Sequence, residues 1–71
     1  MIDSYALTGI FYAIERRSKE VSDHTHAYFV NDLDEINIEM VIKRIGLIRG
    51  GLDLASQIIE EYQSSGGKAN E

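Results

Sequence analysis

The chain has 71 residues, which is enough for one small domain, and no cysteine, which excludes disulfides and thiolate metal sites. Its 12 acidic residues outnumber 7 basic ones, giving a formal net charge of −5. This charge disfavours sequence-independent binding to nucleic acid, because lysine and arginine must neutralise phosphates. A domain of this size has a marginal core and is usually stabilised by disulfides, a metal or oligomerisation. We therefore expect self-association.

The hydropathy pattern gives no sign of a membrane protein or a secreted one. No apolar run approaches the roughly 20 residues that a membrane span needs. The N-terminal stretch MIDSYALTGIFYAIERRSKE lacks the basic segment that opens a secretion signal, and it soon becomes charged. We therefore expect a cytoplasmic protein.

Residues 4–22 are predicted to form the first helix, which Asp3 and Ser4 can cap at its N-terminus. No proline interrupts the segment, and its apolar residues recur at spacings of three and four, as one face of a helix requires. They are Leu7, Ile10, Phe11, Ile14 and Val21. Tyr5 and Tyr12 lie on a different face. Together with Tyr28, they are either interface anchors or ordinary side chains at the rim of a core.

The segment SDHTHAYFVNDLD is predicted to connect this helix to a second one. Residues 27–30 have strand propensity, but four residues cannot form a stable sheet alone. They can form a buried connector, an extension of either helix, or an edge strand that pairs with a second copy. Asp32 followed by Glu35 resembles a capping box, so the second helix is expected to begin about there.

The second predicted helix, ending near Tyr62, carries the strongest pattern in the sequence. Eight residues spaced alternately by three and four form an uninterrupted heptad seam: Ile38, Val41, Ile45, Ile48, Leu52, Ala55, Ile59 and Tyr62. A second apolar stripe is formed by Met40, Leu47 and Leu54, and Gly51 lies beside it. We therefore expect this helix to be buried on more than one side, with both stripes and the tyrosines Tyr5 and Tyr12 contributing to interfaces.

Two adjacent glycines, Gly50 and Gly51, are unusual residues inside a helix, but the heptad pattern continues through them in phase. Each interior glycine costs about 1 kcal/mol relative to alanine, which suggests a packing reason for keeping it. A loop seldom preserves register, so we favour one continuous helix in which Gly51 allows another backbone to approach closely. The competing interpretation is a helix-turn-helix, with Asp53 as a new N-cap.

The predicted fold is all-α: a helical hairpin with a shorter first helix, a connector and a long heptad helix, assembled as a dimeric bundle. The first helix would be about 27 Å long and the second about 45 Å, so the first cannot cover both apolar stripes of the second. A twofold homodimer satisfies the pattern, and a helix from another protein satisfies it equally well. Residues 1–63 are expected to form the single domain, and the polar, glycine-rich residues 64–71 a disordered tail.

The sequence offers little chemistry, and we expect no enzyme activity, no cofactor and no metal. His24 and His26 are the only histidines, whereas zinc usually takes three or four ligands. The acidic clusters at residues 32–35 and 60–61 are not near a candidate base or nucleophile in the sequence. No phosphate-binding glycine loop is present, because Gly50-Gly51 is not followed by lysine and serine or threonine.

Three hypotheses about function follow. The first is a small acidic interaction module, an adaptor, regulator or inhibitor, that acts as a homodimer and binds an unidentified protein partner through a helix face. The second is an acidic nucleic-acid mimic that blocks a DNA-binding enzyme, although the acidic residues are scattered. The third is a small dimeric DNA-binding regulator that uses Arg16, Arg17 and Lys19, which the net charge disfavours.

Overall fold

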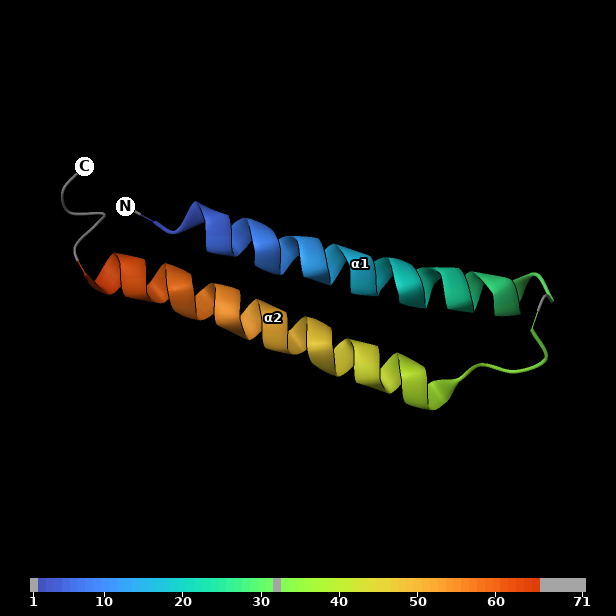
Figure 1. Ribbon diagram of the computed structural model, residues 1–71. Helices are drawn as coiled ribbons and strands as arrows, with labels where there is room; N and C mark the ends of the chain where they lie inside the picture. Colours follow the sequence, from blue (N-terminus) through green and yellow to red (C-terminus); the bar gives the residue numbers. More distant parts are fainter. Residues whose placement is uncertain (1, 32, 66–71) are drawn as a thin grey trace.

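The chain folds into a hairpin of two antiparallel helices that lie side by side along most of their length (Figure 1). The computed structural model describes residues 2–31 and 33–65, with α1 spanning Ser4–Phe29 and α2 spanning Ile38–Ser64. The start of α1 and the end of α2 meet at one end of an elongated molecule measuring 56 × 16 × 13 Å. The prediction of an all-α helical hairpin is confirmed.

Local interactions mark both ends of α1. The Asp3 carboxylate accepts a hydrogen bond from the backbone N–H of Ala6 at 2.9 Å, which confirms the predicted N-cap of α1. At the other end the Val30 N–H donates to the His26 carbonyl. Asn31 has a φ of 68°, and asparagine tolerates this left-handed conformation, which ends many helices.

The prediction that the first helix ends at Ser22 is wrong, because α1 continues to Phe29. Of the three alternatives for residues 27–30, the helix extension is correct as far as Phe29. Strand propensity reflects packing on a sheet, and none of the described residues forms a strand that could offer one. A tertiary contact also holds this last part of α1, because the Asn37 backbone N–H donates to His24 Nε2 at 2.8 Å.

The prediction that the second helix begins at an Asp32–Glu35 capping box is also wrong. Asp32 lies outside the described residues, and α2 begins at Ile38 with Asn37 as its N-cap. The Asn37 side chain accepts a hydrogen bond from the Met40 N–H at 3.0 Å. The N-cap is therefore the residue directly before Ile38, where the apolar pattern begins, and not Asp32. The two helices therefore have nearly equal lengths, 26 and 27 residues, and the argument for a dimer from unequal lengths does not hold.

The helix α2 passes through Gly50 and Gly51 without interruption. The continuous helix is confirmed and the helix-turn-helix alternative is wrong, as the unbroken heptad phase predicts. Of the expected tail, Ser64 belongs to α2 and Ser65 caps it, with its N–H donating to the Glu61 carbonyl at 2.9 Å. The rest of the predicted tail, residues 66–71, lies outside the described residues.

The seam between the helices is formed by residues that alternate at spacings of three and four on both. It contains Leu7, Ile10, Ile14, Arg17, Val21 and His24 of α1, and Val41, Arg44, Ile48, Gly51, Ala55, Ile58 and Tyr62 of α2. Half of the predicted heptad seam of α2, namely Ile38, Ile45, Leu52 and Ile59, is therefore exposed beside the seam. Among the described residues Ala55 alone is buried, so the hairpin has almost no core of its own.

Compared with the predicted heptad seam, α2 is rotated about its own axis. The close contact at Gly51 accounts for this rotation. A Cβ atom built on this glycine would lie 3.0 Å from Cγ1 and 3.2 Å from Cδ1 of Ile14. The missing side chain lets α1 approach α2 at Gly51, which brings this glycine rather than Leu52 into the seam. A neighbour does approach Gly51 closely, but the nearest atoms belong to the side chains of Ile14 and Ile10 and not to the backbone that the sequence predicted.

Candidate interaction surface

One side of the hairpin is formed by the residues that directly follow the seam residues. Each residue turns an α-helix by about 100°. Because the helices run in opposite directions and their seams face each other, a step forward from the seam leads to the same side on both. This side carries a row of large apolar side chains, which we call the isoleucine face: Phe11 of α1 and Ile38, Ile42, Ile45, Leu52 and Ile59 of α2.

The six side chains of the isoleucine face are between 39% and 63% exposed, although each is large and apolar. Most of the remaining positions on this side are small and uncharged, such as Ser18, Ser22 and Ser56. Of the described residues that follow the seam, Glu15 and Arg49 are the charged ones. A face of this kind is unusual on a monomer and is typical of a surface that another protein covers.

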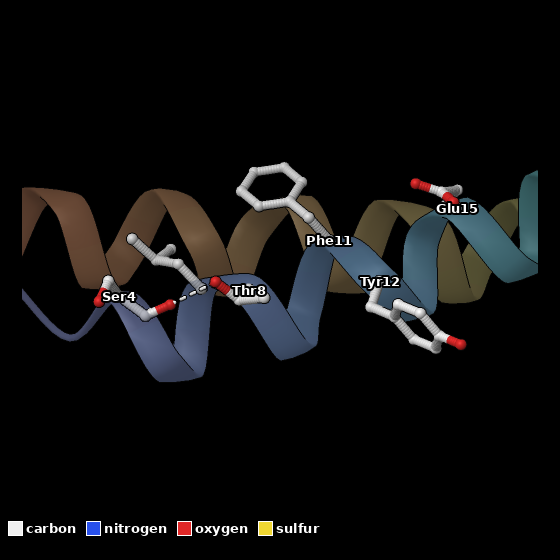
Figure 2. A pocket seen from close by; sticks show the side chains of 6 residues that line it. Ser4, Thr8, Phe11, Tyr12 and Glu15 are labelled. Atoms are coloured by element: carbon white, nitrogen blue, oxygen red, sulfur yellow. Dashed lines mark hydrogen bonds between the residues drawn. The ribbon is translucent and has the colours of Figure 1, made fainter.

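The α1 part of this side forms an open groove around Phe11 (Figure 2). It is lined by Ser4, Leu7, Thr8, Phe11, Tyr12 and Glu15. Figure 2 shows Phe11 and Glu15 on the same side of α1, whereas Tyr12 points the other way. The Thr8 hydroxyl donates to the Ser4 carbonyl at 2.7 Å and so lies folded back onto the helix. All six lining residues belong to α1, so the groove lies on the outside of the hairpin, where a side chain from a partner can enter it.

The opposite side, formed by the residues that directly precede the seam, has a different composition. We call it the charged side, because it carries Arg16, Glu20, Asp23, Lys43 and Glu61. The Arg44 side chain in the seam reaches this side, where Nη2 lies 3.2 Å and Nε 3.3 Å from the same Glu20 oxygen. The predicted stripe of Met40, Leu47 and Leu54 also lies here.

The predicted interface residues thus divide into three groups. Val41, Ile48, Gly51, Ala55 and Tyr62 pack against α1. Ile38, Ile45, Leu52 and Ile59 are on the isoleucine face, and Met40, Leu47 and Leu54 are on the charged side. Tyr5 and Tyr12 are exposed on the outer surface of α1, where Tyr12 also lines the edge of the groove beside Phe11.

Sequence reasoning missed two apolar residues of the isoleucine face. Phe11 was assigned to the core-facing stripe of the first helix, but its position directly after Ile10 turns it out of the seam. Ile42 was assigned to no stripe, although it lies four residues after Ile38 and three before Ile45. These spacings of three and four were the available signal.

The chemistry-bearing residues do not gather into a site. In the part of the chain that the structure describes, no group of three or more histidine, aspartate or glutamate residues is placed to hold a metal ion. His24 and His26 are both in α1, where a spacing of two turns them to different sides. Within the same ranges, neither helix is long and apolar enough to cross a membrane. Comparisons with protein families, curated proteins and solved structures found no match to this chain.

Proposed function

We propose that this protein is a small acidic interaction module, an adaptor, regulator or inhibitor, that acts as a homodimer through helix-face packing. The observation that carries the proposal is the isoleucine face. Six large apolar side chains line one side of the hairpin at 39–63% exposure, while Ala55 is the one buried residue in the described ranges. Burying a fully exposed side chain of this size contributes roughly 1.5–3 kcal/mol, and covering these half-exposed side chains would contribute about half of that for each.

The DNA-binding alternative receives no support from the positions of its basic residues. Arg17 lies in the seam, and Lys19 pairs with Asp23 one helical turn away, with Nζ 3.2 Å from the carboxylate. Arg16 and Lys19 are three residues apart and share one side of α1, but Arg17 is turned into the seam, so the three do not make one phosphate-binding surface. The acidic mimic is not favoured by any particular arrangement of carboxylates. Cytoplasmic location and the identity of a further protein partner stay predictions.

Sedimentation at micromolar concentration tests the proposal with a matched pair of variants. Leu52 on the isoleucine face is 45% exposed and Leu54 on the charged side is 49% exposed, so the two differ mainly in position. We expect a dimer for the unmodified protein and for Leu54→Asp. Leu52→Asp should be a monomer, because a lone carboxylate cannot be buried in an apolar interface without a large cost. A monomeric unmodified protein, or equal effects of the two variants, would refute the homodimer.

A further inference from the structure

We infer that the isoleucine face binds a second copy of this chain about a twofold axis parallel to the helices. In this arrangement α1 of each copy lies over α2 of the other, and together they form a four-helix bundle. The inference rests on the proposed function and adds to it the orientation in which the second copy binds. Three features of the face carry it: the register of the hairpin, the sizes of the facing side chains and the positions of two charges.

The contacts across the seam establish which residues of α1 and α2 lie at the same height. Gly51 packs between Ile10 and Ile14, since a Cβ atom there would lie 3.7 Å from Cγ2 of Ile10 and 3.0 Å from Cγ1 of Ile14. The Arg44–Glu20 ion pair agrees with this register. The residue after Gly51 is therefore level with Phe11, and steps of seven residues lead to further matched layers. These layers are Ser4 with Ile59, Phe11 with Leu52, Ser18 with Ile45, and Thr25 with Ile38.

The sizes of the side chains in these layers favour placing α1 over α2 of the second copy. In three of the four layers, α1 contributes a serine or threonine and α2 an isoleucine. With the twofold axis parallel to the helices the layers stay in register, so each isoleucine meets a small residue and the facing surfaces interdigitate. A twofold axis perpendicular to the helices would instead stack isoleucine on isoleucine or leucine, and leave unfilled space where Ser4 meets Thr25.

The two charges of the face discriminate between the same two arrangements. Glu15 follows Ile14 and Arg49 follows Ile48, and the register places them within about one residue, roughly 1.5 Å, of the same height. With the parallel axis, Glu15 meets Arg49 of the partner subunit, and this ion pair forms twice. With the perpendicular axis, Glu15 would lie beside Glu15 of the partner subunit, and the two arginines would also meet. Charge complementarity therefore selects the parallel axis.

Spin labels on single cysteines test the arrangement, because the chain has no cysteine of its own. Gly50 is near the middle of α2, on the charged side and with open space around it, so a label on Gly50→Cys gives an interchain distance of roughly 30 Å across the bundle in either dimer, which is short enough to measure. A label on Ser64→Cys reports the orientation. We expect under about 30 Å between Ser64 labels, because neighbouring helix axes in a bundle are 8–10 Å apart. The perpendicular axis would separate these labels by about 45 Å, at 1.5 Å per residue.

Each outcome of the labelling experiment has one meaning. Short distances at both sites support the parallel arrangement. A short distance at Gly50 with a long one at Ser64 overturns the arrangement but leaves the homodimer of the proposed function in place. The absence of any interchain distance at Gly50, together with a monomer mass, overturns both.

Charge variants give a second, independent test by sedimentation equilibrium at low salt. Glu15→Arg and Arg49→Glu each replace two attractive pairs with two repulsive ones, so each should weaken the dimer roughly three- to tenfold. The double variant Glu15→Arg/Arg49→Glu should recover the original affinity. Arg16→Glu on the charged side is the control, because it changes the net charge as Arg49→Glu does and should leave the affinity nearly unchanged. Equal affinities of both single variants and the unmodified protein would overturn the parallel arrangement.

Discussion

The isoleucine face and the charged side flank the same seam, and each is built from residues one position away from it. On the charged side, apolar residues such as Leu47 and Leu54 share the surface with charged residues of both helices, and the Arg44–Glu20 pair crosses between the helices. On the isoleucine face, Ile38, Ile42 and Ile45 follow one another without a charged residue between them on that side. This difference in composition is the reason for proposing the isoleucine face, and not the charged side, as the interface.

A second copy on the isoleucine face would also explain how a hairpin with almost no core can be stable. Two helices alone bury one side of each, and in the described ranges this leaves Ala55 as the sole buried residue. A second copy on the isoleucine face would give each helix a second buried side, which is how four-helix bundles form a core. The free energy of unfolding is therefore expected to depend on protein concentration, because a dimer's stability does.

The largest effect should come from a charge placed on the isoleucine face. Ile45 on that face is 40% exposed, and Leu47 on the charged side is 42% exposed. Ile45→Asp should lower the free energy of unfolding by roughly 2–4 kcal/mol, because it places an unpaired carboxylate in an apolar interface. Leu47→Asp should lower it by less than about 1 kcal/mol, as surface substitutions do. Urea unfolding at matched concentration measures both, and similar losses would mean that the two sides do not differ.

Alanine substitutions at the two glycines should change the free energy of unfolding by a smaller amount, and the sign should differ between Gly50 and Gly51. Gly50, on the charged side, has open space around it, so Gly50→Ala should raise the free energy of unfolding by about 0.5–1 kcal/mol. In Gly51→Ala the added methyl would lie 3.0 Å from Ile14 Cγ1, and Ile14 must shift to accommodate it. This substitution should therefore be neutral or destabilising. Thermal melts of both variants at one protein concentration measure the two signs. If both substitutions stabilise the protein, the seam has room for a methyl group at Gly51.

The smallest effect is expected at the ion pair on the charged side. The Glu20 side chain is 47% exposed, and exposed ion pairs contribute only about 0.2–1 kcal/mol. Glu20→Gln should therefore lower the free energy of unfolding by no more than this and should leave the sedimentation of the dimer unchanged. A change in oligomeric state would contradict the assignment of the interface to the other side of the hairpin.

The sequence alone determined the class of the fold and several of its local features. Spacings of three and four predicted both helices, Asp3 was identified as the first N-cap, and the unbroken phase across Gly50-Gly51 predicted one continuous helix. These are properties of neighbouring residues, which the chain carries before it folds. The helix boundaries at Phe29 and Ile38 were not predicted. They depend in part on a contact between distant residues, the hydrogen bond from Asn37 to His24.

Only the tertiary structure decided which side of α2 meets α1. The apolar residues of α2 cover more than half of its circumference, so periodicity is compatible with several rotations of the helix. The close contact between Gly51 and Ile14 selects one of them. That rotation brings Arg44 and Ile58 into the seam, and it turns Ile45 and Leu52 outward. Because one glycine lets α1 approach at that position, residues that the heptad pattern assigned to a single seam are divided between a hairpin contact and an uncovered face.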